Sequence, residues 1–295
     1  MKTQHRDFSR AALLLCMCLY HWTMVHSQTL PGERSVERVP TPFLEDGKSV
    51  TLEAVVFKPT EAGTGPWPTL IFMHGSTGEG NKPEYFKQTF ISQGAVNGFV
   101  KRGWMVIFPQ RRGRGASDGL YDEGFRPDRS AYTCNTKITL AGLERAKADA
   151  RAITAWVQTR SDINPQKLIL GGISRGGILS VVHGAEPDLP YKAIVNFVGG
   201  WIGDVCPTAS EVNTASFRQA AQGKLPSLWL YGFNDPFYSI AHSKANFDAF
   251  IGAGGNGQWH AIQPLAGESG HLISFRHALW EEFLWPFVDK HTLGN

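Results

Sequence analysis

The chain has 295 residues, of which 42% are hydrophobic and 19% are charged, so it is long enough to bury a full core as one α/β domain. Its 29 basic and 26 acidic residues give a formal net charge of only +3, and no run of like charge or basic-aromatic patch occurs. This balance argues against nucleic acid or another polyanion as the partner.

The first 27 residues have the pattern of a secretory signal peptide. Basic residues precede a short apolar run at 11–20, and the small residue Ser27 marks the expected cleavage site. The apolar run is shorter than the roughly 20 residues that span a bilayer, which favours a cleaved signal peptide. An uncleaved membrane anchor is the alternative. We therefore expect a secreted or periplasmic protein without stable membrane insertion, in which residues 28–295 form one domain.

Two cysteines remain after the expected cleavage. Cys134 and Cys206 both lie in turn-rich stretches, and an even pair in an exported protein predicts one disulfide between two loops. Two free thiols are the alternative. No C-x-x-C, His-Glu-x-x-His or calcium-loop spacing occurs, so we expect neither a metal nor another cofactor.

Strands alternate with helices along the first half of the chain. The β-branched stretch 49–57 predicts an early edge strand, and the apolar runs 69–73 and 104–108 predict strands that are covered on both faces. Apolar residues at helical spacing predict helices over 83–102 and 140–160. This alternation is typical of a parallel sheet.

The second half continues the same alternation. The pattern predicts strands at 168–173, 193–198, 227–232 and 258–265, and helices at 175–183, 241–251 and 274–288. The stretch 199–223 is irregular at first and helical later, in a position to roof a pocket. The sequence therefore predicts an α/β fold with a mainly parallel sheet, helices on both faces, and ligand chemistry at the carboxyl ends of the strands.

A candidate nucleophile stands where one predicted strand meets a helix. The strand ends in Gly-Ile-Ser-Arg-Gly at 172–176, which is a G-x-S-x-G motif in its strand-turn-helix context. The glycines leave room for the sharp turn, and the positive end of the helix dipole favours an anionic intermediate. Ser174 is therefore the predicted nucleophile. Taken alone, such a motif is also found in ordinary glycine-rich loops.

The end of the strand 69–73 offers candidate oxyanion donors. This strand runs into His74-Gly75-Ser76, where free backbone N–H groups are expected at the sheet edge. We predict the N–H groups of Ser76 and Arg175 as the two donors, and a structural place for His74 beneath the turn. A plain strand-to-loop turn is the alternative.

An acid and a base follow later strands. Asp235 lies just past the strand 227–232, and His271 follows the strand 258–265. A serine hydroxyl needs a base within hydrogen-bond reach and a third group that orients the base, so we assign these roles to His271 and Asp235. Their order, serine then acid then histidine, is the one expected for this motif. Asp204 and Glu268 are the alternative acids.

A cluster of arginines follows the strand 104–108. Arg111, Arg112 and Arg114 lie in a loop at the predicted carboxyl edge of the sheet, where they could grip a substrate carboxylate. The simpler interpretation, which we favour, is that they pair with acidic residues of the loop. The candidates are Asp118, Asp122 and Glu123.

These motifs together resemble the α/β-hydrolase superfamily. The resemblance rests on His74-Gly75-Ser76, the stretch 172–176, Asp235 and Gly270-His271, and it covers essentially the whole chain after the leader. Within the superfamily the chain looks like the dienelactone-hydrolase-like and prolyl-oligopeptidase-like branch. The arginine-rich loop 112–119 is similar to one in cocaine-esterase-type and X-prolyl dipeptidyl peptidase hydrolases.

The resemblance implies an α/β-hydrolase fold, a triad of Ser174, Asp235 and His271, and oxyanion donors at Ser76 and Arg175. Dienelactone hydrolases typically have a cysteine where this chain has Ser174, which disfavours a lactone substrate. We therefore expect an exported serine hydrolase that cleaves small carboxylic esters through an acyl-enzyme. A small serine peptidase acting on short peptides is the alternative, and a non-catalytic binding protein is disfavoured because every triad member is present.

Overall fold

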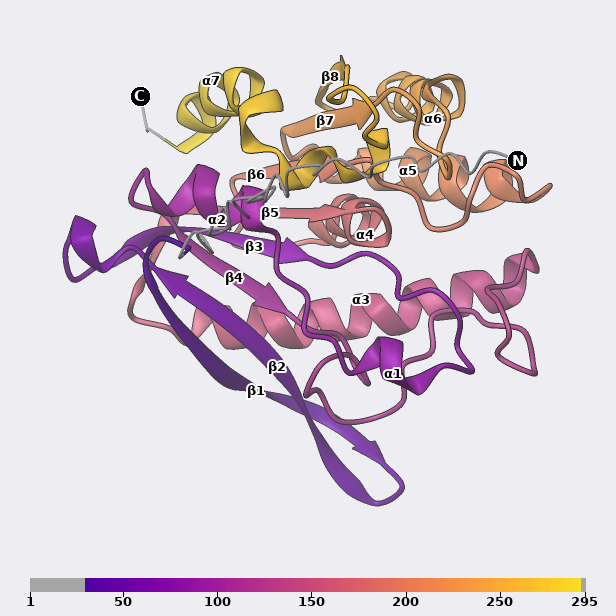
Figure 1. The fold of residues 1–295 in the computed structure, drawn as a ribbon, viewed down its shortest axis with the longest axis horizontal. Coiled ribbons are helices and arrows are strands. Elements are labelled where there is room, and N and C mark those ends of the chain that lie inside the picture. The colour runs from indigo at the N-terminus through magenta and orange to yellow at the C-terminus, as the bar shows by residue number, and fades with distance from the viewer. Residues whose placement is uncertain (1–29, 293–295) are drawn as a thin grey trace, which may run out of the picture.

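The structure is a computed structural model that describes residues 30–292 (Figure 1). The predicted signal peptide, residues 1–27, lies outside the described residues. Within 30–292, no helix combines the length and the apolar character that crossing a membrane requires.

A single eight-stranded sheet organises the described residues. Its spatial order is β1-β2-β4-β3-β5-β6-β7-β8. The strands are β1 (Glu33–Glu45), β2 (Lys48–Lys58), β3 (Trp67–Met73), β4 (Met105–Pro109), β5 (Ile163–Ile173), β6 (Ala193–Phe197), β7 (Ser227–Gly232) and β8 (Gly257–Ile262). The pairs β1–β2 and β2–β4 are antiparallel, and every other neighbouring pair is parallel. The mainly parallel sheet is therefore confirmed.

The predicted edge strand at 49–57 does not lie at the edge. It forms most of β2, which pairs with β4 on one side and with β1 on the other. Figure 1 shows β1 and β2 as a long hairpin that projects beyond the rest of the sheet. Only Val39 of β1 is buried, because most of this strand carries polar side chains. Without an apolar run, the pattern that reveals the other strands is missing here.

Helices cover both faces of the sheet, as predicted. They are α1 (Pro83–Phe86), α2 (Gln93–Val100), α3 (Thr136–Gln158), α4 (Arg175–Gly184), α5 (Ala215–Ala220), α6 (Ile240–Gly252) and α7 (Glu281–Thr292). On one face α2 and α7 pack together, with the rings of Phe99 and Trp285 5.0 Å apart. On the other face α3, α4, α5 and α6 form a continuous layer.

The long helix predicted over 83–102 is broken into α1 and α2. Between them, the side-chain amide of Gln110 accepts a hydrogen bond from the Phe90 N–H (2.8 Å) and donates one to the Phe90 carbonyl (2.9 Å). These bonds replace the ones that a helix would make. Ser92 then starts α2 by accepting the Ala95 N–H, as an N-cap residue does.

The closing helix predicted over 274–288 begins later, at Glu281. Two 3₁₀ turns, Gly270–Phe275 and His277–Leu279, precede it. The indole N–H of Trp280 donates to the Ile273 carbonyl (3.1 Å), so a side chain satisfies a backbone group that an α-helix would have used. These turns carry His271 over the carboxyl edge of the sheet.

Candidate active site

Ser174 stands on a sharp, strained turn between β5 and α4. Its φ and ψ are 56° and −122°, a backbone conformation that non-glycine residues rarely adopt. Its N–H donates to the carbonyl of Phe197 on the neighbouring strand (2.9 Å). Such a turn at the end of a central strand is the geometry that a nucleophile elbow requires.

The two glycines of the motif are steric requirements of this turn. A Cβ on Gly172 would lie 2.4 Å from the carbonyl oxygen of Gly176, and a Cβ on Gly176 would lie 2.1 Å from the carbonyl oxygen of Met73. Both contacts are with backbone, which cannot swing aside. The first turn of α4 can approach β3 this closely only because both positions lack a side chain.

The predicted acid and base are in direct contact. Asp235 follows β7 and has a buried side chain, while His271 lies in the 3₁₀ turn after β8. The Nδ1 of His271 and the Oδ2 of Asp235 are 2.9 Å apart. With Nδ1–H donating to the carboxylate, the Nε2 atom is left as the proton acceptor.

The two alternative acids have other partners. The carboxylate of Asp204 accepts the backbone N–H of Ser239 (2.8 Å), and that of Glu268 pairs with the guanidinium of Arg276. Neither carboxylate contacts His271, which leaves Asp235 as its acidic partner among the described residues.

Ser174 and His271 line one cavity of about 290 Å³. Ser76 and Arg175 line the same cavity, so the predicted nucleophile, base and oxyanion residues are brought together, with Asp235 behind His271. Within residues 30–292, no hydrogen bond joins Ser174 Oγ to the His271 ring. Catalytic hydrogen bonds are often long before substrate binds, so this geometry is compatible with proton transfer.

The predicted oxyanion donors have suitable surroundings. Arg175 is the first residue of α4, so its N–H has no acceptor within the helix. Gly75 allows the loop after β3 to pass beside the nucleophile, because a Cβ there would already lie 3.2 Å from Ser174 Cβ. Ser76 follows directly and lines the cavity.

His74 lies beneath this turn and supports it. Its Nδ1 bonds to the Gly75 carbonyl (2.7 Å), and its Nε2 accepts the Arg111 N–H (3.0 Å). Burial, with the nearby charges of Arg111 and Arg114, holds the pKa of His74 well below its ordinary value. The ring is therefore neutral and structural, as the sequence indicates.

The arginine loop is bound inward. Arg111 pairs with Glu123, one of the expected acids, and Arg112 pairs with Asp149 (2.6 Å) and Glu45 (3.3 Å), which were not expected. All of these guanidinium groups are buried. Arg111 and Arg112 thus stabilise the loop and are not free to bind a substrate carboxylate.

The side chain of Arg175 has a role that the sequence did not reveal. It donates to the carbonyl of Glu123 (2.6 Å), and its guanidinium lies 3.6 Å from the ring centroid of Tyr132 and 4.6 Å from that of Trp201. Cation–π contacts of this kind hold two aromatic walls of the cavity in place. The partners are far apart in the chain, and no local pattern marks them.

The predicted disulfide is present. Cys134 and Cys206 are bonded across a sequence separation of 72 residues. Cys206 lines the cavity, and Thr133, which precedes Cys134, also lines it. The disulfide therefore ties together two loops that shape the candidate site.

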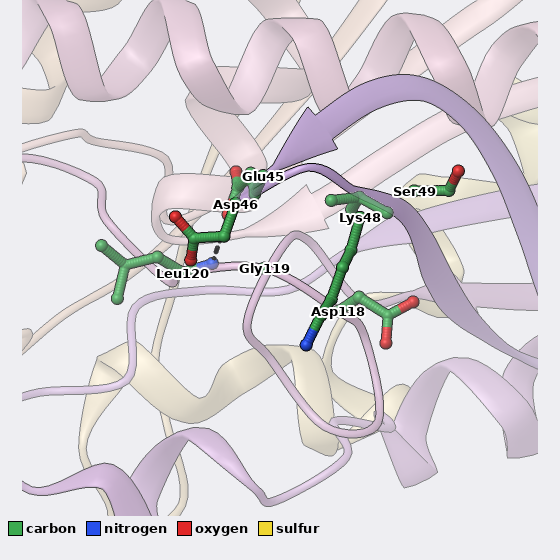
Figure 2. Close-up of a pocket in the computed structure, with 8 residues that line it drawn as sticks. Glu45, Asp46, Lys48, Ser49, Asp118, Gly119 and Leu120 are labelled. Atoms are coloured by element: carbon green, nitrogen blue, oxygen red, sulfur yellow. Dashed lines mark hydrogen bonds between the residues drawn. The ribbon is translucent and has the colours of Figure 1, made fainter.

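A second hollow of about 450 Å³ lies near the tip of the β1–β2 hairpin (Figure 2). It shares no lining residue with the cavity at Ser174. Figure 2 shows the carboxylate of Glu45 hydrogen-bonded to the Leu120 N–H, a distance of 2.8 Å. Glu45 also pairs with Arg112 of the arginine loop and with Arg145 of α3, so its carboxylate joins the hairpin to both elements.

The fold and the site define an α/β-hydrolase: a mainly parallel sheet, a serine elbow at a strand end, and an acid–histidine pair at the same edge. A model of the X-Pro dipeptidyl-peptidase family (S15) matches residues 46–205, more than half of the chain. The chain therefore belongs to this family and is a hydrolase. The match includes Ser76, Ser174 and Arg175 but ends before Asp235 and His271.

Solved structures agree on the fold. An esterase of Pyrococcus furiosus is 15% identical, with a TM-score of 0.60 over 88% of this chain and 91% of that one. Est1E of Butyrivibrio proteoclasticus, solved with ferulic acid, is 16% identical, with a TM-score of 0.59 over 88% and 100%. A puromycin-hydrolysing peptidase of Mycobacterium tuberculosis is 20% identical, with a TM-score of 0.57 over 88% and 39%. No curated protein sequence gave a significant match.

Proposed function

We propose that residues 28–295 form an exported serine hydrolase that cleaves carboxylic esters through an acyl-enzyme on Ser174. One observation carries this proposal: the His271–Asp235 pair borders the same small cavity as a serine on a strained elbow. Export rests on the pattern of the first 27 residues.

Each residue has a defined part in the proposed reaction. Ser174 Oγ attacks the ester carbonyl carbon while His271 Nε2 takes the hydroxyl proton, and the N–H groups of Ser76 and Arg175 stabilise the oxyanion. The bond to the alcohol oxygen then breaks, and that oxygen leaves with the proton from His271. Water attacks the acyl-enzyme in the same way, which releases the acid and returns a proton to Ser174.

The lining of the cavity favours an ester over the amino terminus of a peptide. A peptidase that removes dipeptides must hold a free ammonium group, and a desolvated cation needs a nearby carboxylate. Among the described residues that line the cavity, none is Asp or Glu. The charge of Arg175 is already matched by the buried carboxylate of Glu123, 3.6 Å from its guanidinium, which also pairs with Arg111. A neutral ester fits these surroundings better.

The family and one structural neighbour support a peptidase as the second candidate. The matching family is that of X-Pro dipeptidyl-peptidases, and the neighbour from Mycobacterium tuberculosis hydrolyses puromycin. The esterase of Pyrococcus furiosus supports the first candidate equally at the level of the fold. The choice between the two therefore depends on substrate.

A substrate panel tests the choice. We expect p-nitrophenyl esters of short acyl chains to be turned over with much higher kcat/KM than X-Pro or aminoacyl p-nitroanilides. The Ser174→Ala variant, purified in parallel, measures any background hydrolysis of these activated esters. Faster cleavage of an X-Pro anilide than of every ester would replace the esterase by the peptidase.

A further inference from the structure

We propose that Phe237 and Val205, here called the apolar rim, bind the leaving alcohol of the substrate and give the enzyme a preference for esters of large apolar alcohols. The inference rests on the proposed ester hydrolysis. It concerns the part of the substrate that departs first, whereas the acyl group stays on Ser174.

The position of the leaving alcohol follows from the chemistry. Its oxygen must take the proton from His271 as the tetrahedral intermediate collapses, so the alcohol lies on the His271 side of the reacting carbon. The side chain that borders this position is Phe237, whose ring centroid is 4.7 Å from that of His271. Any alcohol larger than a few atoms must extend over this ring.

Phe237 is exposed at the edge of the cavity and is not part of the hydrophobic core. Its side chain is 52% exposed although the residue also lines the cavity. A large apolar group in contact with it would remove apolar surface of both partners from water, which favours binding. The cavity of about 290 Å³ is at the small end for ligand sites, so a bulky alcohol would remain outside it, on the rim.

The carboxylate of Asp235 fixes the position of His271 relative to Phe237 of the apolar rim. Oδ2 of Asp235 contacts His271, while Oδ1 accepts the N–H groups of Phe237 (2.8 Å) and Tyr238 (3.1 Å). His271, the proposed proton donor, and Phe237 of the apolar rim are therefore fixed relative to each other before substrate binds. Preorganisation of this kind lowers the entropy cost of binding.

Val205, in the loop after β6, is the second residue of the apolar rim. Its side chain is 85% exposed, and the neighbouring Asp204 donates its N–H to the Phe237 carbonyl (3.0 Å). A Cβ on Gly203 would lie 3.5 Å from that same carbonyl oxygen and 3.8 Å from a methyl carbon of Val205. The disulfide at Cys206 secures this loop, so both rim residues have anchored backbones.

The experiment uses ethyl, butyl and hexyl acetate, which share an acyl group and have alcohols of similar basicity. We expect the kcat/KM of the wild-type enzyme to rise with alcohol length. The Phe237→Ala variant should lower the hexyl-to-ethyl ratio of kcat/KM roughly tenfold, about 1.4 kcal/mol of selectivity. Val205→Ala should lower it less, and Phe237→Leu should restore most of it.

The control is Leu44→Ala on β1, another exposed apolar side chain (70%) that is remote from the cavity in sequence and not among its lining residues. It should keep the wild-type ratio. The loss in Phe237→Ala should appear in the rate of acylation, measured by rapid quench, because all three esters leave the same acetyl group on Ser174.

Two results would contradict the proposed role of the apolar rim. An equal loss for ethyl and hexyl acetate would mean that Phe237 only supports His271, and an unchanged ratio would mean that the rim serves something other than the alcohol, such as a partner protein. In both cases an inactive Ser174→Ala enzyme would leave the proposed esterase standing. An active Ser174→Ala enzyme would remove both proposals together.

Discussion

At the scale of single residues, the two oxygens of Asp235 have separate tasks. One orients the His271 ring, and the other holds the backbone of the loop that carries Phe237 and Tyr238. The orientation of the His271 ring and of the adjacent loop backbone therefore depends on one side chain. A substitution that alters only one oxygen can separate these tasks.

Asp235→Asn is that substitution. The asparagine Oδ1 can still accept the two backbone N–H groups, but its amide would face the Nδ1–H of His271 with a second donor and favour the wrong tautomer. We expect kcat for ester hydrolysis to fall by roughly 10⁴-fold with little change in melting temperature.

Glu268→Gln is the matched control, because Glu268 is a partly exposed carboxylate that pairs with Arg276 and not with His271. It should retain the wild-type kcat. If Asp235→Asn kept more than about a tenth of the wild-type rate, the acid would have to be assigned elsewhere.

His74 predicts a pH dependence of stability. Its pKa is held well below 6.5 in the folded protein and returns to the ordinary value on unfolding. The unfolded chain therefore gains a proton below pH 6.5 that the folded protein resists, so stability is lost as the pH falls through this range.

The measurement is urea unfolding at pH 7 and pH 5 for the wild type and His74→Gln, whose neutral amide can also donate and accept. The wild type should lose more stability than the variant between these pH values, because only the wild type has a histidine at this position that is held neutral. Equal losses would show that the folded protein does not hold His74 neutral.

At the scale of elements, the elbow depends on the fit between the start of α4 and the end of β3. Gly176 lies where a Cβ would meet the Met73 carbonyl at 2.1 Å. This close approach places Ser174, the proposed nucleophile, next to the loop after β3 that carries the proposed oxyanion donor Ser76. Packing and function therefore share the same glycine.

Gly176→Ala should destabilise the protein by about 3 kcal/mol or more, since backbone must shift to admit the methyl group. The control is Gly252→Ala at the end of α6, where a Cβ would meet nothing within 4 Å. That variant should be neutral or slightly stabilised, because alanine favours a helix. Similar chemical-denaturation midpoints for the two variants would contradict the close contact at the elbow.

The disulfide joins two further elements, the loop before α3 and the loop after β6. Replacing both Cys134 and Cys206 by serine should lower the free energy of unfolding by about 2–4 kcal/mol, because the unfolded chain regains freedom. It should also raise KM, since Cys206 lines the cavity. Alkylation of Cys134 or Cys206 in the native, unreduced protein would contradict the bond.

At the scale of the whole molecule, local patterns predicted the alternation of strands and helices and placed the site at the strand ends. They succeeded where an apolar run stands alone, as in β3 and β7, and where a motif forces a turn, as at Ser174. The sheet then brought Ser174, Asp235 and His271 to one edge, because parallel strands all end on the same side.

What the sequence could not predict depends on long-range contacts. The Gln110 amide interrupts a helical pattern at Phe90, and a polar strand, β1, adds itself outside β2. The cation–π contacts of Arg175 with Tyr132 and Trp201 also join residues that are distant in the chain. None of these leaves a periodic signal, so they emerge only in three dimensions.

The central claim is that Ser174 carries the acyl group, and trapping that covalent species tests it most directly. A fluorophosphonate should add the mass of one phosphonyl group to the wild-type enzyme. Peptide mapping should place this adduct on Ser174. Ser174→Ala should show no adduct and should lose ester turnover by roughly 10⁴-fold or more at an unchanged melting temperature. An adduct on another residue, or ester turnover that survives in Ser174→Ala, would contradict the account.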